Sequence, residues 1–286
     1  MTEGARLTFL GTGTSQGIPM IGCGCEVCAS RDQRDKRLRS SALVDYGGLR
    51  ILIDAGPDFR QQMLRENVSH VDAILLTHNH KDHTGGLDDI RAFNYTEKRP
   101  VQIYCEKYVE ESLRQEYSYA FAEKKYPGAP EWNVHEICNS PFNVSGSCGT
   151  DRLEWHSGKG YVHVGTDSDS TEKPRTVSII PIRGMHYKLP VLGFRFGNIA
   201  YCTDMNMIPE EEFGKLRGLD HFVINCVRSG RHISHFSIEE AVAVARRVGA
   251  RHSWLTHMSH QLPCHGILEE SLPENIRPAY DGLVIE

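Results

Sequence analysis

Residues 77–83 of this chain read THNHKDH and hold four side chains that bind metals: His78, His80, Asp82 and His83. Imidazole and carboxylate groups are the nitrogen and oxygen ligands that proteins use for zinc and other divalent metals. Imidazoles gathered this closely repel one another once they are protonated, whereas a bound metal keeps them neutral. The H-x-H-x-D-H spacing therefore predicts a metal-binding loop.

The elements before these side chains would place them at the edge of a sheet. Residues 71–76 (VDAILL) form an apolar run typical of a buried strand, and the metal-binding loop follows it directly. In α/β folds this edge carries the chemistry. Three more potential ligands follow β-type runs, namely His186 after a strand ending at Pro181, Asp204 after residues 199–203, and His257 after residues 251–256. We interpret them as the rest of the site.

A second cluster holds three thiols, Cys23, Cys25 and Cys28, within six residues. In a reducing compartment such a group indicates a structural zinc bound by thiolates, which requires a fourth ligand. His260 is the favoured fourth ligand because it lies three residues after His257, so that one loop would contact both sites. Cys264 and His265 are the competing choices.

The remaining pattern predicts an α/β protein in one domain, residues 1–286. Residues 41–46 and 50–54 suggest a hairpin, and residues 237–248 a helix whose first turn carries a Ser-x-x-Glu capping box. The pattern loosens through an elaborated insertion around residues 106–175, where Pro, Gly and Ser recur.

Composition excludes several classes of protein. No apolar run reaches the roughly 20 residues that span a bilayer, and the N-terminus lacks the features of a secretory signal, so we expect a cytoplasmic protein without membrane contact. Nine cysteines, an odd number, fit a reducing setting better than a disulfide framework. The net charge of −5 disfavours a nucleic-acid polymer as partner. A homodimer is the assembly we consider.

The complete set of motifs resembles the metallo-β-lactamase superfamily. That resemblance implies a four-layer αβ/βα sandwich with two metals at one edge of the sheets. It implies that His78, His80 and His186 bind the first metal, that Asp82, His83 and His257 bind the second, and that Asp204 bridges both. It also identifies Asp54, at the end of its strand, as an acid that orients a ligand histidine. All ligand positions are filled, which favours a working hydrolase.

The Cys-x-Cys-x-x-Cys run, together with His257-Met258-Ser259-His260, narrows the resemblance. It is similar to the phosphodiesterases of the bacterial carbon–phosphorus lyase pathway, which open five-membered cyclic phosphates of ribose. It is also similar to an accessory protein of pyrroloquinoline-quinone (PQQ) biosynthesis, whose metal set is incomplete. The complete set here favours a phosphodiesterase that acts on a small phosphorylated substrate, a cyclic ribose phosphate or 2′,3′-cyclic nucleotide.

The expected mechanism assigns catalysis to Asp82, Asp204 and His235. A hydroxide held by two active-site metals, zinc or manganese, would attack phosphorus in line. His235 precedes the capped helix, where free backbone N–H groups favour an anion, so it could donate to the phosphate or protonate the leaving oxygen. A solvent-facing histidine is the alternative interpretation.

Two other functions remain open from the sequence. A relative of the tRNA 3′-processing nucleases would need a basic surface to hold its polyanion. A metal-stabilised carrier, as in PQQ biosynthesis, would contain about one zinc per chain, whereas the hydrolase would contain about three metals.

Overall fold

The computed structural model describes residues 4–146, 151–157, 160–166 and 175–286. Two seven-stranded sheets form its centre. The first has the order β16-β1-β2-β3-β4-β5-β6, with the bounds β1 Arg6–Gly11, β2 Ser41–Tyr46, β3 Leu49–Ile53, β4 Ala73–Leu75, β5 Val101–Cys105, β6 Trp132–Glu136 and β16 Val284–Ile285. The second has the order β15-β14-β13-β12-β11-β10-β7, with the bounds β7 Phe142–Ser145, β10 Thr176–His186, β11 Leu189–Phe196, β12 Ile199–Cys202, β13 His221–Asn225, β14 His252–Thr256 and β15 Ile276–Pro278.

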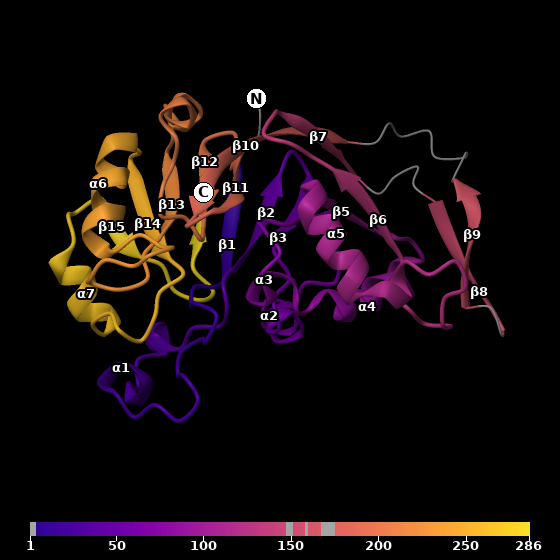
Figure 1. Cartoon of the computed structure of the whole chain (residues 1–286), viewed down its shortest axis with the longest axis horizontal. Helices are drawn as coiled ribbons and strands as arrows, with labels where there is room; N and C mark the ends of the chain where they lie inside the picture. The colour runs from indigo at the N-terminus through magenta and orange to yellow at the C-terminus, as the bar shows by residue number, and fades with distance from the viewer. Residues whose placement is uncertain (1–3, 147–150, 158–159, 167–174) are drawn as a thin grey trace.

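Helices lie on the outer faces of this pair of sheets, with α2, α4 and α5 on one flank and α6 and α7 on the other (Figure 1). The α-helices are α1 Glu26–Ala29, α2 Phe59–Arg65, α3 Lys81–Thr84, α4 Arg91–Glu97, α5 Lys107–Glu116, α6 Ile238–Val248 and α7 His265–Ser271. The 3-10 helices are η1 Gln33–Asp35, η2 Leu87–Ile90, η3 Ser118–Ala120 and η4 Glu210–Leu216. Within the described residues, no helix combines the length and apolar character needed to cross a membrane.

Alternation along the strands separates the core into layers. Ile51 and Ile53 of β3 pack between the two sheets, whereas Leu52 packs towards the helices. On the other sheet Val223 faces the first sheet and Phe222 faces the helical side. Successive side chains of a strand point to opposite faces, so strands that are apolar on both faces need cover on both. The result is the predicted four-layer αβ/βα sandwich.

Parallel pairing brings strand ends from both sheets to one edge. The strands β3 to β6 are parallel to one another, as are β12 to β15. A backbone hydrogen bond of 3.0 Å from Leu192 N to Thr77 O joins the second sheet to the loop after β4. The chain segments after β3, β4, β12 and β14 therefore meet, and they carry the residues identified from the sequence.

Two expectations from the sequence need comment. The end of the strand expected at Pro181 was predicted wrongly. β10 continues to His186, and it pairs with β11 from Ile180 opposite Arg195 to His186 opposite Leu189. In the region 106–175, β6 and β7 each extend one of the main sheets, whereas β8 (Asp151–His156) and β9 (Gly160–Thr166) form a separate two-stranded sheet at one extremity (Figure 1). Parts of that region lie outside the described residues, and the single-domain organisation stays a prediction.

Candidate metal centre

Three residues of the site adopt a left-handed backbone directly after strands. The φ angles are +60° at Asp54, +57° at Asp204 and +53° at His257. For a residue with a Cβ this conformation costs roughly 1–3 kcal/mol and persists only where the surroundings enforce it. Here it turns each side chain from the strand direction into the shared edge. Three of the six non-glycine residues with positive φ in the described part of the chain are therefore residues that the sequence assigned to the site.

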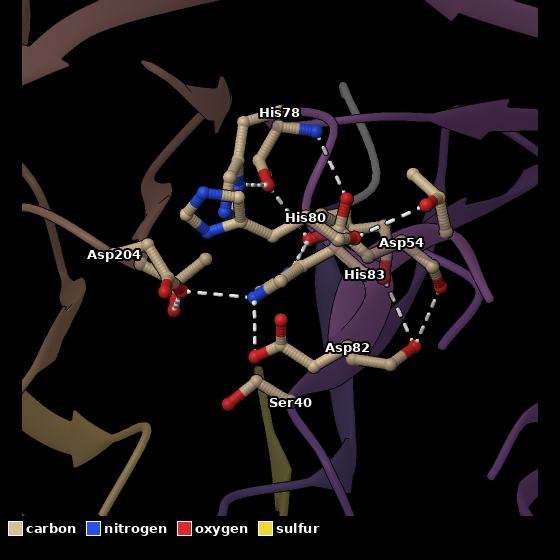
Figure 2. A network of polar contacts seen from close by, with 12 residues as sticks. Ser40, Asp54, His78, His80, Asp82, His83 and Asp204 are labelled. Atoms are coloured by element: carbon tan, nitrogen blue, oxygen red, sulfur yellow. Dashed lines mark hydrogen bonds and ion pairs between the residues drawn. The ribbon is translucent and has the colours of Figure 1, made fainter. Parts of the chain in front are cut away.

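His83 connects the buried acid Asp54 with the two other aspartates. Its Nδ1 lies 2.7 Å from Asp54 Oδ2. Its Nε2 lies 3.1 Å from Asp204 Oδ2 and 3.4 Å from Asp82 Oδ2 (Figure 2). Burial disfavours a charge on His83, but the carboxylates of Asp204, Asp82 and Asp54 hold its pKa well above the usual range. In this arrangement Asp54 orients a histidine of the site, as the resemblance implied.

Thr77 fixes the orientation and tautomer of His78. The backbone N of Thr77 donates to Asp54 Oδ1, and the Thr77 hydroxyl donates to Asp54 Oδ2, each at 2.9 Å. The same hydroxyl lies 2.9 Å from His78 Nδ1. A hydroxyl has one proton, so Nδ1–H of His78 must be the donor to it. The Nε2 atom of His78 then carries a free lone pair, as a metal ligand requires.

Asp204 is the carboxylate around which the histidines gather. Its Oδ2 lies 3.1 Å from His257 Nδ1 and accepts a hydrogen bond of 2.7 Å from Thr203 Oγ1. Its Oδ1 lies 3.9 Å from His235 Nδ1. His235 in turn packs its ring against His186 and His257, with centroid separations of 4.5 and 4.9 Å. His235 therefore lies among the histidines of the site, with its side chain mostly buried.

The structure gathers some of the predicted site residues in two overlapping groups, which include His235, predicted as catalytic, and leave out His78 and His80, predicted for the first metal. Ligand atoms lie within 4.8 Å of one another in the set Asp82, His83, Asp204 and His257, and in the set His186, Asp204 and His235. The first set contains every residue assigned to the second metal together with the bridging aspartate. His78 and His80 adjoin these groups, with ring centroids 4.3 Å apart for His78 and His83 and 5.0 Å apart for His80 and His186.

Burial and neighbouring charges set complementary protonation states. Burial, and then the nearby His83, hold the pKa of His78 well below its usual range. Burial, and then His257, lower the pKa of His235 to about 3. Burial opposes ionisation of Asp204, yet His257 and His83 hold its pKa well below its usual range. Neutral His78 and His235 beside an ionised Asp204 have the protonation states that suit metal binding, whereas His83, whose pKa is raised by the carboxylates around it, would have to release its proton to a bound metal.

The donor atoms fit divalent metals. Within the described part of the chain, four buried imidazole nitrogens of this site lack a hydrogen-bond partner: His78 Nε2, His83 Nε2, His186 Nδ1 and His235 Nδ1. An unsatisfied buried polar atom costs about 1–3 kcal/mol, so four of them at one site indicate that they serve a ligand. Imidazole nitrogens with carboxylate oxygens suit zinc or manganese.

The thiol cluster forms a separate site on the other side of His257. The side chains of Cys23, Cys25, Cys28 and His260 bring their ligand atoms within 4.8 Å of one another. His260 Nδ1 lies 3.3 Å from Cys23 Sγ and 3.4 Å from Cys25 Sγ. The backbone N–H of Cys28, and then His260, lower the pKa of Cys25 to about 6, which favours the thiolate.

Neither competing fourth ligand belongs to the group of ligand atoms, although Cys264 packs against the same small cluster as Cys23 and Cys25. His265 Nδ1 lies 3.1 Å from the Arg37 guanidinium, which engages it in a different contact. Cys264 is not a member of the thiol group. His260, the favoured choice, is therefore the residue that the fold brings to the three thiols.

Two supporting residues were missed by sequence reasoning. Ser40 Oγ lies 3.2 Å from His257 Nδ1, although Ser40 is 217 positions away in the chain. Thr203 bonds to the neighbouring Asp204. A threonine directly precedes a ligand at Thr77 and again at Thr203. This recurrence is a signal by which Thr203 could have been predicted. No local signal marks Ser40, because its role depends on the packing of β2 near the loop after β14.

Comparison with known proteins identifies the family of this chain. The model of the family described as "Beta-lactamase superfamily domain" matches residues 49–258. A protein of Porphyromonas gingivalis named octanoyltransferase is 38% identical over 281 residues, which are 97% of this chain and 51% of that protein. The chain thus spans about half the length of that relative.

Two solved structures resemble the whole chain. One is described as a new diphosphatase from the PhnP family; it is 35% identical, with a TM-score of 0.80, over 99% of this chain and 97% of that one. The other is zinc-bound PqqB from Methylobacterium extorquens, 18% identical with a TM-score of 0.66, over 98% of this chain and 99% of that one. The second likeness concerns the fold alone.

Proposed function

The chain belongs to the beta-lactamase superfamily, whose members are typically metal-dependent hydrolases, and from that premise we propose that it hydrolyses small phosphodiesters. The observation that carries the proposal is the position of Asp204. This single carboxylate lies between His83 and His257 on one side and His235 on the other. Such a carboxylate suits a bridge between two metals that clamp one phosphate.

We assign two metals, zinc or manganese, to this centre. His78, His80 and His186 would hold the first, Asp82, His83 and His257 would hold the second, and Asp204 would contact both. When bound, the metals supply Lewis acidity that activates a water and neutralises charge on the phosphate. A third metal, a structural zinc, is assigned to Cys23, Cys25, Cys28 and His260.

His235 is assigned to the leaving group. Its side chain is mostly buried, and it faces Asp204 between the rings of His186 and His257. A neutral imidazole still carries one N–H, so His235 can donate a hydrogen bond to a phosphate oxygen. The negative charge of a bound phosphate would favour the imidazolium form, which can give one proton to the leaving oxygen and return to the neutral ring. Once ionised, Asp204 and Asp82 can accept hydrogen bonds but have no proton to donate. His235 is therefore the donor best placed to contact the leaving oxygen.

The substrates we favour are cyclic ribose phosphates and 2′,3′-cyclic nucleotides. The thiol cluster and the full set of ligand residues support this class, as does the 35% identity to a PhnP-family structure over nearly the whole chain. The description of that structure as a diphosphatase makes diphosphate diesters a second class to test. The octanoyl transfer named for the Porphyromonas relative forms no part of the proposal, since the chain spans half of that protein.

Hydrolysis of 2′,3′-cyclic AMP and of bis(p-nitrophenyl) phosphate tests the proposal. The metal-loaded wild type should cleave at least one of them, and precursor tRNA should remain uncut. His235→Ala should lower kcat by roughly 10²–10⁴-fold while metal content stays unchanged. The exposed His252, which stacks on His221, offers His252→Ala as the control. Full turnover by His235→Ala would refute the role of His235, and an inert wild type would refute the function.

A further inference from the structure

A cavity of about 600 Å³ opens beside the metal centre, between Tyr187 on one side and the loop before His235 on the other. Its lining includes Tyr187, Asn206 and His232. The ring of His232 lies 5.1 Å, centroid to centroid, from the ring of His235. Ligand cavities typically measure about 300–1,000 Å³, so this one has room for a substrate portion next to the reacting phosphate.

Asn206 holds the two walls of this cavity together. Its Oδ1 accepts a hydrogen bond of 2.8 Å from Tyr187 N, and its Nδ2 donates one of 3.0 Å to Ile233 O. Tyr187 itself is fixed in the left-handed region, with a φ of +58°. Asn206 is also two residues after Asp204. The cavity and the metal centre are thus built on the same loops, and a ligand in one would lie close to the other.

The charge of the lining is mostly positive. Arg228 and Arg231 contribute two guanidinium groups, and in the described part of the chain Glu240 is the one carboxylate of the lining. Glu240 Oε2 already accepts a hydrogen bond of 2.9 Å from Ser237 N in the capping box of α6. Arg228 donates to the carbonyl oxygens of Gly230 and Arg231, which leaves its charge uncompensated by these contacts.

The charge of Arg228 acts on His232, a histidine of the cavity lining. Burial, and then the Arg228 charge, lower the pKa of His232 from its usual range. Two guanidinium groups next to a phosphate-cleaving centre resemble the forked donors that bind phosphate through paired N–H groups. Neither arginine lies among the metal-site residues, so the reaction proposed above does not account for their position.

We propose that this cavity is the subsite for a second phosphate group of the substrate, bound by Arg228 and Arg231. The inference rests on the proposed function and extends it: within each proposed class, a substrate that carries a second phosphate group binds more tightly than one with a single phosphate. The scissile phosphate would lie at the metals, and the second phosphate would lie on the far side of His232.

Calorimetry with two adenine nucleotides tests the subsite. The metal-loaded wild type should bind α,β-methylene-ADP, which has two phosphorus groups and a bridge that resists cleavage, more tightly than AMP. The double variant Arg228→Ala/Arg231→Ala should lose about tenfold or more affinity for α,β-methylene-ADP and less than about twofold for AMP. Arg246→Ala, on the exposed face of α6, is the control and should change neither affinity.

A second variant guards against distortion of the loop, since Arg228 bonds to two backbone carbonyls there. Arg231→Ala alone should lower the affinity for α,β-methylene-ADP by about threefold or more and leave the affinity for AMP unchanged. Equal losses for both nucleotides, or no loss for either, would overturn the subsite. Hydrolysis of bis(p-nitrophenyl) phosphate is followed in parallel: if the wild type is inert while the selective loss persists, the proposed reaction fails and the subsite stands.

Discussion

The metal centre and the thiol cluster share one loop but are supported in different ways. At the metal centre, buried groups such as Thr77 and Asp54 fix the orientation of His78 and His83 before any metal binds. At the thiol cluster, Cys23 and Cys25 are only partly buried, and the short helix α1 that follows Cys25 is four residues long. The comparison indicates that the first site is formed by the fold, whereas the segment that carries the second site would be stabilised by the zinc proposed for it.

The loop from His257 to His260 connects the two sites. His257 belongs to the metal centre and His260 to the thiol cluster, and between them Met258 pairs with Gly13 of the N-terminal segment. Ser259 Oγ donates a hydrogen bond of 2.6 Å to Val227 O, which anchors the loop to the second sheet. Loss of the structural metal should therefore reach the catalytic centre only through this anchored loop, and its effect on turnover should be the smaller.

The largest effect is expected at Asp204. Asp204→Asn keeps the shape but removes the charge that lies between His83 and His257, so metals should bind poorly and kcat/KM should fall by roughly a thousandfold or more. The assay is bis(p-nitrophenyl) phosphate hydrolysis together with metal analysis. The exposed Asp89 provides a control, Asp89→Asn, which should retain activity. Wild-type kcat/KM in Asp204→Asn would remove this residue from the centre.

A smaller loss is expected when the support behind His83 is weakened. Asp54→Asn replaces an oxygen that accepts from both Thr77 and His83 with an amide that cannot accept from both. The affinity for zinc at the metal centre should fall by about 10–100-fold, measured by titration against a competing chelator. Asp45→Asn, which alters a surface ion pair with Arg50, should leave the affinity unchanged. An unchanged affinity in Asp54→Asn would show that His83 is held by other contacts.

The thiol cluster should affect stability more than chemistry. Cys25→Ser should remove about one zinc per chain and lower Tm by roughly 5–10 °C, as expected for a loss of a few kcal/mol in a chain of this size. The kcat should change by less than about tenfold. Cys138→Ser is the matched control, because Cys138 is an exposed free thiol. If Cys25→Ser kept its full metal content and Tm, the cluster would not be a metal site.

The smallest effect is expected from Ser40. Ser40→Ala removes the hydroxyl near His257 Nδ1, a neutral contact worth about 0.5–1.5 kcal/mol, so kcat/KM should fall by less than about tenfold. Ser253→Ala, which removes a buried hydroxyl of β14 away from the centre, serves for comparison. A loss as large as that of Asp204→Asn would mean that Ser40 has a more direct role than orientation.

Local pattern was sufficient to predict most elements of the sandwich. The capped helix α6 and its end at Gly249 match the structure, because capping is decided within a few residues. The end of β10 could not be foreseen, because it is set by pairing with β11 and not by the residues after Pro181. The role of Ser40 and the Arg228–Arg231 cavity could not be predicted from the sequence for the same reason, because the segments that form them meet only in the folded chain.

Metal content of the purified wild type tests the central claim most directly. Two sites of different construction should together hold about three metals per chain, two of which exchange with a chelator while the structural zinc is retained longer. Chelation should abolish phosphodiester hydrolysis, and zinc or manganese should restore it. A single zinc per chain, bound to the thiol cluster with nothing at Asp204, would contradict the account and favour a carrier.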